Sequence, residues 1–153
     1  MKFYLMQHGK PVAKEENPER PLTIQGIDDV KKMAEFLEKC GVRVSRVLHS
    51  GKTRAKQTAE IMISRLNPGE EPMEQRGLSP TDDVKNFIEQ INEMEEDIMI
   101  FGHLPHLARL ISLLIVGSES ISIVAFQQGG VVCLLRDNDR HWSISWMLVP
   151  EII

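Results

Sequence analysis

The stretch KFYLMQHG, residues 2–9, decides the fold because it joins an almost continuously apolar run to a histidine and a glycine. Such a run is typical of a β-strand covered on both faces. We therefore expect a buried strand over residues 2–7, with His8 and Gly9 just beyond its carboxyl end. In open α/β sheets this end of a strand is where ligands bind.

Apolar patterns outward from this stretch alternate between strand and helix. A helix is expected between Thr23, its N-cap, and Gly41, and another from about Lys52 to Leu66. A third is expected after Thr81 as N-cap, with Val84, Ile88 and Ile91 facing the core. Two further apolar runs, RVLHS at 46–50 and DIMIFG at 97–102, predict buried strands, and LPHLARLISLLIVG at 104–117 predicts a deeply packed helix that ends at Gly117.

The C-terminal part changes character. The runs SISIVAF (120–126), VVCLLR (131–136) and WSISWMLV (142–149) predict strands, and QQGG and DNDRH between them predict antiparallel hairpin connections. Alternating strands and helices followed by hairpins predict an α/β fold with three layers, in which one sheet lies between two layers of helices (α/β/α). The sheet is expected to be mostly parallel with C-terminal antiparallel strands, in a single domain over residues 1–153.

Composition excludes several classes of function. The net charge of −4 and the isoelectric point near 5.7 provide no basic field for nucleic acid. Cys40 and Cys133 are isolated, so neither a disulfide framework nor a zinc site is expected. No run approaches the roughly 20 apolar residues of a membrane span, and the N-terminus lacks the features of a signal peptide. We therefore expect a cytoplasmic protein that binds neither nucleic acid nor membrane.

Polar side chains recur where the predicted strands end. His8 follows the first strand, Ser50 and Arg54 follow the second, and His103 follows the third, so all four are expected at one edge of the sheet. Each also has a structural interpretation, as a hydrogen-bonded strand-end histidine or a solvated helix arginine. A metal site at His103 and His106 is disfavoured because no carboxylate accompanies the pair.

Four motifs occur in order along the chain: QHG at 7–9, RPLTIQG at 20–26, HSGKTRAKQTAEI at 49–61 and FGHLPHL at 101–107. Together they resemble the histidine phosphatase superfamily, and within it the small phosphohistidine phosphatases of the SixA type. This resemblance covers nearly the whole chain. It implies a phosphoglycerate mutase-like fold and a phosphatase that needs no cofactor or metal.

The resemblance also implies roles for individual residues. His8 would be the phosphate-accepting nucleophile, Arg54 and His103 would lie in the phosphate pocket, and Arg20 would lie near its mouth. Gln7, Gly9 and Ser50 would complete the phosphate contacts. The chemistry is consistent, because a neutral imidazole can attack phosphorus through one nitrogen while a hydrogen bond holds the other N–H.

Gln7 departs from the family pattern, which has arginine before the nucleophile. A glutamine amide donates hydrogen bonds but carries no charge. Charged hydrogen bonds contribute about 1.5–3 kcal/mol against about 0.5–1.5 for neutral ones, so the difference predicts a slower enzyme rather than an inactive one. Lys10 and Lys52 lie near the motifs and are candidates to restore part of the charge.

A leaving-group acid is the least determined part of the site. Asp83, with Asp82 as the alternative, resembles the position of such an acid, but a helix-capping role is equally consistent with the sequence. A phosphoramidate makes less demand on this group, because a protonated imidazole leaves easily.

Three functions remain open at this level. The first is a phosphatase for phosphohistidine on a signalling protein, such as a histidine-containing phosphotransfer domain, that releases inorganic phosphate. The second is a phosphate- or phosphohistidine-binding module with little turnover, which Gln7 favours. The third is a phosphatase for small metabolites, which a short chain with little sequence for a lid disfavours.

Overall fold

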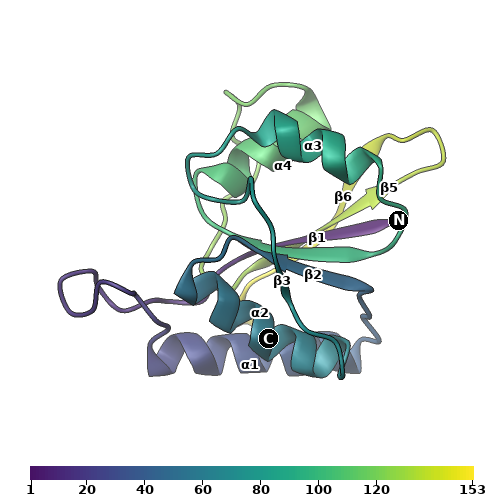
Figure 1. The fold of residues 1–153 in the computed structure, drawn as a ribbon. Helices are drawn as coiled ribbons and strands as arrows, with labels where there is room; N and C mark the ends of the chain where they lie inside the picture. Colours follow the sequence, from purple (N-terminus) through teal and green to yellow (C-terminus); the bar gives the residue numbers. More distant parts are fainter.

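The fold is a six-stranded sheet between two pairs of helices, shown by a computed structural model that describes residues 1–153 (Figure 1). The strand order is β3-β2-β4-β1-β5-β6. β1, β2, β3 and β4 are parallel, whereas β5 and β6 are antiparallel to their neighbours. The strands are β1 (Lys2–Gln7), β2 (Arg46–His49), β3 (Met73–Glu74), β4 (Ile98–Gly102), β5 (Val131–Arg136) and β6 (Trp142–Leu148).

Two helices cover each face of the sheet. In Figure 1, α1 and α2 lie on one side of the strands and α3 and α4 lie on the other. The helices are α1 (Ile24–Lys39), α2 (Thr53–Leu66), α3 (Val84–Asn92) and α4 (His106–Val116), followed near the C-terminus by the short 3-10 helix η1 (Pro150–Ile152). The predicted three-layer α/β architecture, with antiparallel strands at one side, is confirmed. No helix combines the length and the apolar character that a membrane span needs.

β1 lies inside the sheet and is buried on both faces. Tyr4 and Met6 pack into the core formed with α1 and α2, whereas Phe3 and Leu5 pack into the core formed with α3 and α4. Successive strand residues point to opposite faces, so a strand with helices on both sides needs apolar residues at nearly every position. The apolar run in residues 2–7 therefore marks the central strand correctly.

Several predicted helix ends are also confirmed. Thr23 caps α1 by accepting a hydrogen bond from the Gly26 N–H at 3.0 Å. Gly117 ends α4 in the left-handed conformation, with φ of 71°. α3, in contrast, is capped by Asp83 and not by Thr81, because the Asp83 carboxylate accepts from the Lys85 N–H at 2.9 Å.

One expectation about an apolar segment was wrong. Residues 120–126 form no strand, so QQGG is not a hairpin connection; Ile123, Val124 and Phe126 instead pack, partly buried, against the α3/α4 side of the core. α4 is packed as expected over residues 106–115, none of which is exposed, and only Val116 at its end is exposed, at 46%. In α3, Phe87 is fully buried, whereas Ile88 is only partly buried.

Candidate active site

The structure brings His8, Ser50, Arg54 and His103 together at the carboxyl edge of the parallel strands. His8 follows β1, His103 follows β4, Ser50 follows β2, and Arg54 lies in the first turn of α2. β4 lies between β1 and β2, so the three strand ends are adjacent. The ring centroids of His8 and His103 are 5.0 Å apart.

His8 is held with one ring nitrogen fixed and the other available. Its Nδ1 lies 2.8 Å from the Gly9 carbonyl oxygen, and its Nε2 lies 3.1 Å from the Arg54 Nε–H. A carbonyl can only accept, and Arg54 can only donate, so Nδ1 carries the proton and Nε2 carries a lone pair. This tautomer is the one that a nucleophilic imidazole requires.

The surroundings of His8 keep it neutral. Burial is the largest cause that lowers its pKa, to about 4; the hydrogen bond to Gly9 opposes this, and the positive charges of Arg54 and Arg20 reinforce it. Only 6% of the residue is exposed. The Nε2 lone pair is therefore present throughout the neutral pH range.

His103 faces the same region and is bonded to Ser50. Its Nε2 lies 2.6 Å from Ser50 Oγ, whereas its Nδ1 is buried and has no hydrogen-bond partner. Burial lowers the pKa of His103 to about 3, helped by the nearby charges of His8, Arg54 and Lys52. His103 and Ser50 thus offer a neutral, polar pair beside His8.

Arginines and one lysine supply the positive charge of the site. The Arg54 guanidinium is half-buried, and burial followed by the Arg20 charge lowers its pKa from the ordinary value. Arg20 is placed by the loop after β1, where its Nε–H donates to the Val12 carbonyl at 3.2 Å. Lys52 acts electrostatically on His103, whereas Lys10 lies in a separate hollow with Gln127 and Glu151.

Gln7 lies at this edge without engaging the other candidates. It is the last residue of β1 and is 9% exposed, and its main chain bonds to Gly129 and Gly130. Its Oε1 is buried without a hydrogen-bond partner. No hydrogen bond joins its side chain to His8, Arg54 or His103.

Thr58 is a structural part of the site that the sequence interpretation missed. Its hydroxyl accepts from the Gly9 N–H at 3.1 Å and donates to the Arg54 carbonyl at 2.7 Å. Gly9 has no room for a side chain, because a Cβ there would lie 2.8 Å from Val30 Cγ2. The signal in the sequence was a threonine one helical turn after Arg54, within a motif that had been noted only for its arginine; the structure shows this threonine to be fully buried.

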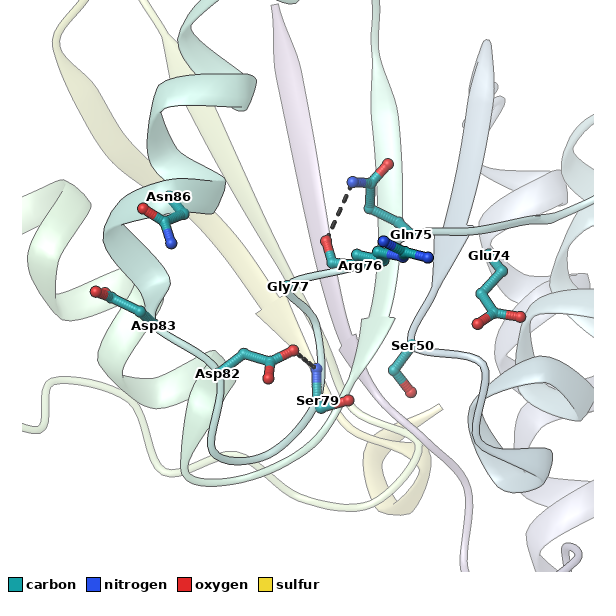
Figure 2. A pocket seen from close by; sticks show the side chains of 9 residues that line it. All are labelled: Ser50, Glu74, Gln75, Arg76, Gly77, Ser79, Asp82, Asp83 and Asn86. Carbon is teal, nitrogen blue, oxygen red and sulfur yellow. Dashed lines mark hydrogen bonds between the residues drawn. The ribbon is translucent and has the colours of Figure 1, made fainter.

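Asp82 and Asp83 line a polar cavity beside the site (Figure 2). Asp82 accepts from the Ser79 N–H at 2.9 Å, and Asp83 caps α3. Neither carboxylate is hydrogen-bonded to His8, Arg54 or His103. The capping interpretation of Asp83 is therefore correct, and the identity of a leaving-group acid stays a prediction.

Two more histidines are buried close to the site. His49, at the end of β2, accepts from the Gly51 N–H at 3.0 Å, and His106, at the start of α4, is fully buried with neither ring nitrogen in a hydrogen bond. Burial lowers the pKa of both. His103 and His106 belong to no group of three or more side chains that could hold a metal ion.

These pKa shifts predict acid sensitivity. Between about pH 4 and pH 6.5, histidines such as His8 and His103 bind protons in the unfolded chain but not in the folded one, so stability falls as pH falls. We expect the free energy of unfolding, measured with urea, to drop by about 1–2 kcal/mol per buried histidine between pH 7 and pH 5. His8→Gln should reduce this slope, and an unchanged slope would contradict the burial argument.

Comparison with known proteins assigns the family. Residues 3–80 match the model of the histidine phosphatase superfamily, branch 1. The chain therefore belongs to this superfamily, and the site lies in a phosphatase fold. The predicted resemblance is confirmed.

Individual proteins are similar to this chain in sequence or in structure. The chain is 26% identical over 155 residues to the phosphohistidine phosphatase SixA of Escherichia coli, covering 98% of this chain and 94% of that one. A structure of SixA with tungstate superposes with a TM-score of 0.85 at 26% identity, covering 98% of this chain and 97% of that one. The α-ribazole phosphatase of Shigella flexneri shares the fold, with a TM-score of 0.80 at 19% identity and coverage of 98% and 97%.

Proposed function

We propose that this protein is a metal-independent phosphatase that removes the phosphoryl group from phosphohistidine on a signalling protein, with His8 as the nucleophile. The observation that carries the proposal is the His8 tautomer, with Nδ1–H held by Gly9 and the Nε2 lone pair directed at Arg54. SixA, 26% identical, is named a phosphohistidine phosphatase and has been crystallised with tungstate, a tetrahedral oxyanion like phosphate.

In the first step, the His8 Nε2 lone pair attacks phosphorus while the bond from phosphorus to the substrate nitrogen breaks. The electron pair of that bond leaves with the substrate imidazole, which takes up a proton from solvent water. Before the reaction, the Arg54 Nε–H donates a hydrogen bond to Nε2. As the new bond forms, Arg54 keeps its proton and donates this hydrogen bond to a phosphoryl oxygen instead. Arg54 and Arg20 provide the positive charge that phosphoryl transfer needs, without requiring a metal ion.

In the second step, water attacks the phosphorylated His8. The bond between phosphorus and Nε2 breaks, its electron pair returns to Nε2, and inorganic phosphate carries away the water oxygen. Ser50 and His103 are the neutral hydrogen-bonding groups beside this reaction, and a hydrogen bond of 2.6 Å joins Ser50 Oγ to His103 Nε2. We assign them to the phosphoryl oxygens, together with Gln7; the expected contact from Gly9 is left out, because its N–H donates to Thr58 and its carbonyl accepts from His8.

The leaving group explains why a weakly defined acid suffices. Protonated imidazole departs from phosphorus more readily than an alkoxide does, so a phosphoramidate needs less proton donation than a sugar phosphate. Asp83 and Asp82 line the neighbouring cavity, and they are the two candidates for this acid that the sequence offers. Asp83 caps α3, and Asp82 accepts a hydrogen bond from the Ser79 N–H. Because both carboxylates are engaged in this way, a substrate that needs no strong acid is favoured.

Phosphate release from three kinds of substrate tests the proposal. A phosphohistidine-containing phosphotransfer domain, p-nitrophenyl phosphate and a sugar phosphate are compared in parallel, with and without EDTA. We expect the phosphotransfer domain to be the best substrate and EDTA to have no effect. A preference for the sugar phosphate would indicate a small-metabolite phosphatase, and binding of the domain without release would indicate a binding module.

Gln7→Arg separates a slow enzyme from a binding module. A guanidinium at this strand end would meet the charge that develops on the phosphoryl oxygens, so we expect the rate constant for phosphoryl transfer to rise about tenfold. Gln7→Met, similar in length but uncharged and without donors, is the matched control and should not raise the rate. Tighter phosphate binding by Gln7→Arg without faster turnover would support the module.

If Lys52 already supplies the charge, Gln7→Arg should have little effect until Lys52 is replaced as well, because both groups would act on the same oxygens. Lys52 is the better candidate of the two lysines, since its charge acts on His103 whereas Lys10 lies in another hollow. A double variant, Gln7→Arg with Lys52→Met, distinguishes these cases in the same rate measurement.

A further inference from the structure

A cavity of about 440 Å³ adjoins the candidate active site and has no hydrophobic lining. It shares Ser50 with the site, and the Ser50 hydroxyl is 2.6 Å from His103 Nε2. Figure 2 shows Ser50 and Glu74 on one side of the cavity and Asp82, Asp83 and Asn86 on the other. Its lining residues are Ser50, Glu74, Gln75, Arg76, Gly77, Ser79, Asp82, Asp83 and Asn86, and we refer to it as the acidic cavity.

The charge of the acidic cavity is opposite to that of the phosphate pocket. Three carboxylates, of Glu74, Asp82 and Asp83, line the cavity together with one guanidinium, of Arg76, which leaves an excess of two negative charges. None of these four side chains is in a salt bridge. Unpaired carboxylates around a cavity favour a cationic occupant.

Local structure places Glu74 and Asp82 on opposite sides of the cavity. Glu74 ends β3 and lies over Gly51, which follows Ser50 with φ of +84°, and a Cβ on Gly51 would come within 2.6 Å of Glu74 Oε1. On the opposite side, the Ser79 N–H holds one oxygen of Asp82. The negative groups thus stand at a defined place next to the catalytic serine–histidine pair.

We propose that the acidic cavity binds a lysine or arginine side chain that lies beside the phosphorylated histidine of a protein substrate. This inference rests on the proposed function, because Arg54 and Arg20 must hold the phosphoryl group while the neighbouring residue reaches the cavity. Ser50 lies between the positively charged phosphate pocket and the acidic cavity. A substrate with a negative phosphoryl group and an adjacent positive side chain is complementary to both. Specificity among phosphohistidine proteins would then be set by this flanking residue.

Two sets of three synthetic phosphohistidine peptides, six in all, test the proposal. They are identical except for one residue next to the phosphohistidine, which is lysine, norleucine or glutamate, and each substitution is made once before it and once after it. Dissociation constants are measured by fluorescence anisotropy on His8→Ala protein, which cannot turn the peptides over. We expect the lysine peptide to bind about fivefold more tightly than the norleucine peptide, and the glutamate peptide to bind most weakly.

Variants of the cavity locate the effect. Glu74→Gln removes a charge at constant size, and Asp82→Asn removes one while keeping an acceptor oxygen for the Ser79 N–H. Both, made in the His8→Ala background, should bring the lysine-to-norleucine ratio towards one, and 1 M salt should do the same by screening. Glu89→Gln, an exposed change of the same kind on α3 outside the cavity, should leave the ratio unchanged.

The outcomes separate this inference from the proposed function. Equal dissociation constants for the three peptides of both sets, or a ratio that Glu74→Gln and Glu89→Gln alter alike, would overturn the cavity assignment. A charge preference in binding with no phosphate release by the parent protein would retain the cavity and reject the phosphatase proposal.

Discussion

His8→Ala should abolish phosphate release, lowering the rate by about 10³-fold or more, because the variant has no lone pair to accept the phosphoryl group. The acid-labile phosphate label that forms on the parent protein during turnover should disappear as well. Phosphate release and label retention after a rapid acid-free quench are the two measurements. The fold should survive, since the substitution removes a side chain at the end of β1 without touching the apolar residues of the strand.

The control for this variant is His141→Ala. His141 lies in the hairpin between β5 and β6 with its side chain 82% exposed, far in the sequence from every candidate residue. Turnover and labelling by His141→Ala should equal those of the parent. Undiminished release by His8→Ala would assign the nucleophile to another group and would remove the basis of the proposed mechanism.

Arg54→Ala should lower the rate of phosphoryl transfer by about 10²- to 10³-fold, the range typical of losing one donor to a developing anionic charge. The Arg54 Nε stands 3.1 Å from His8 Nε2, so the guanidinium is beside the proposed nucleophile before substrate binds. Arg54→Lys keeps a positive charge but loses the forked geometry, and it should recover only part of the activity. Pre-steady-state measurement of His8 phosphorylation isolates this step from the later hydrolysis.

Arg65→Ala is the matched control, because Arg65 lies on the same helix and pairs at the surface with Glu35 and Glu38. Exposed ion pairs contribute little to stability, so this variant should keep both its fold and its activity. If Arg54→Ala lost no more activity than Arg65→Ala, the guanidinium beside His8 would be structural and not a phosphate ligand.

Much of the architecture could be predicted because it depends on local patterns. The apolar run of β1 and the Thr23 and Gly117 caps each follow from a few neighbouring residues. The gathering of His8, Arg54 and His103 could also be anticipated, since parallel strands direct their carboxyl ends to one edge. These inferences need topology but no side-chain detail.

Other features depend on tertiary structure and could not be predicted. β3 has only two residues, Met73 and Glu74, and both are exposed, so it has no apolar signal and exists through backbone pairing with β2. The alternating residues 120–126 looked like a strand, but their apolar side chains are satisfied by packing beside α3 and α4 instead. Thr81 was a reasonable N-cap on sequence grounds, yet α3 begins later, at Val84, and places Asp83 at the cap.

The hydroxyl of Thr58 has a consequence for thermal motion. It links the amide that follows His8 to the carbonyl of Arg54, and the two side chains meet again between Nε2 and Nε. These three hydrogen bonds, together with the covalent chain, form a closed ring that joins the end of β1 to the start of α2. When the sheet and α2 fluctuate against each other, the imidazole and the guanidinium are carried together, and the gap between them varies less than either position does.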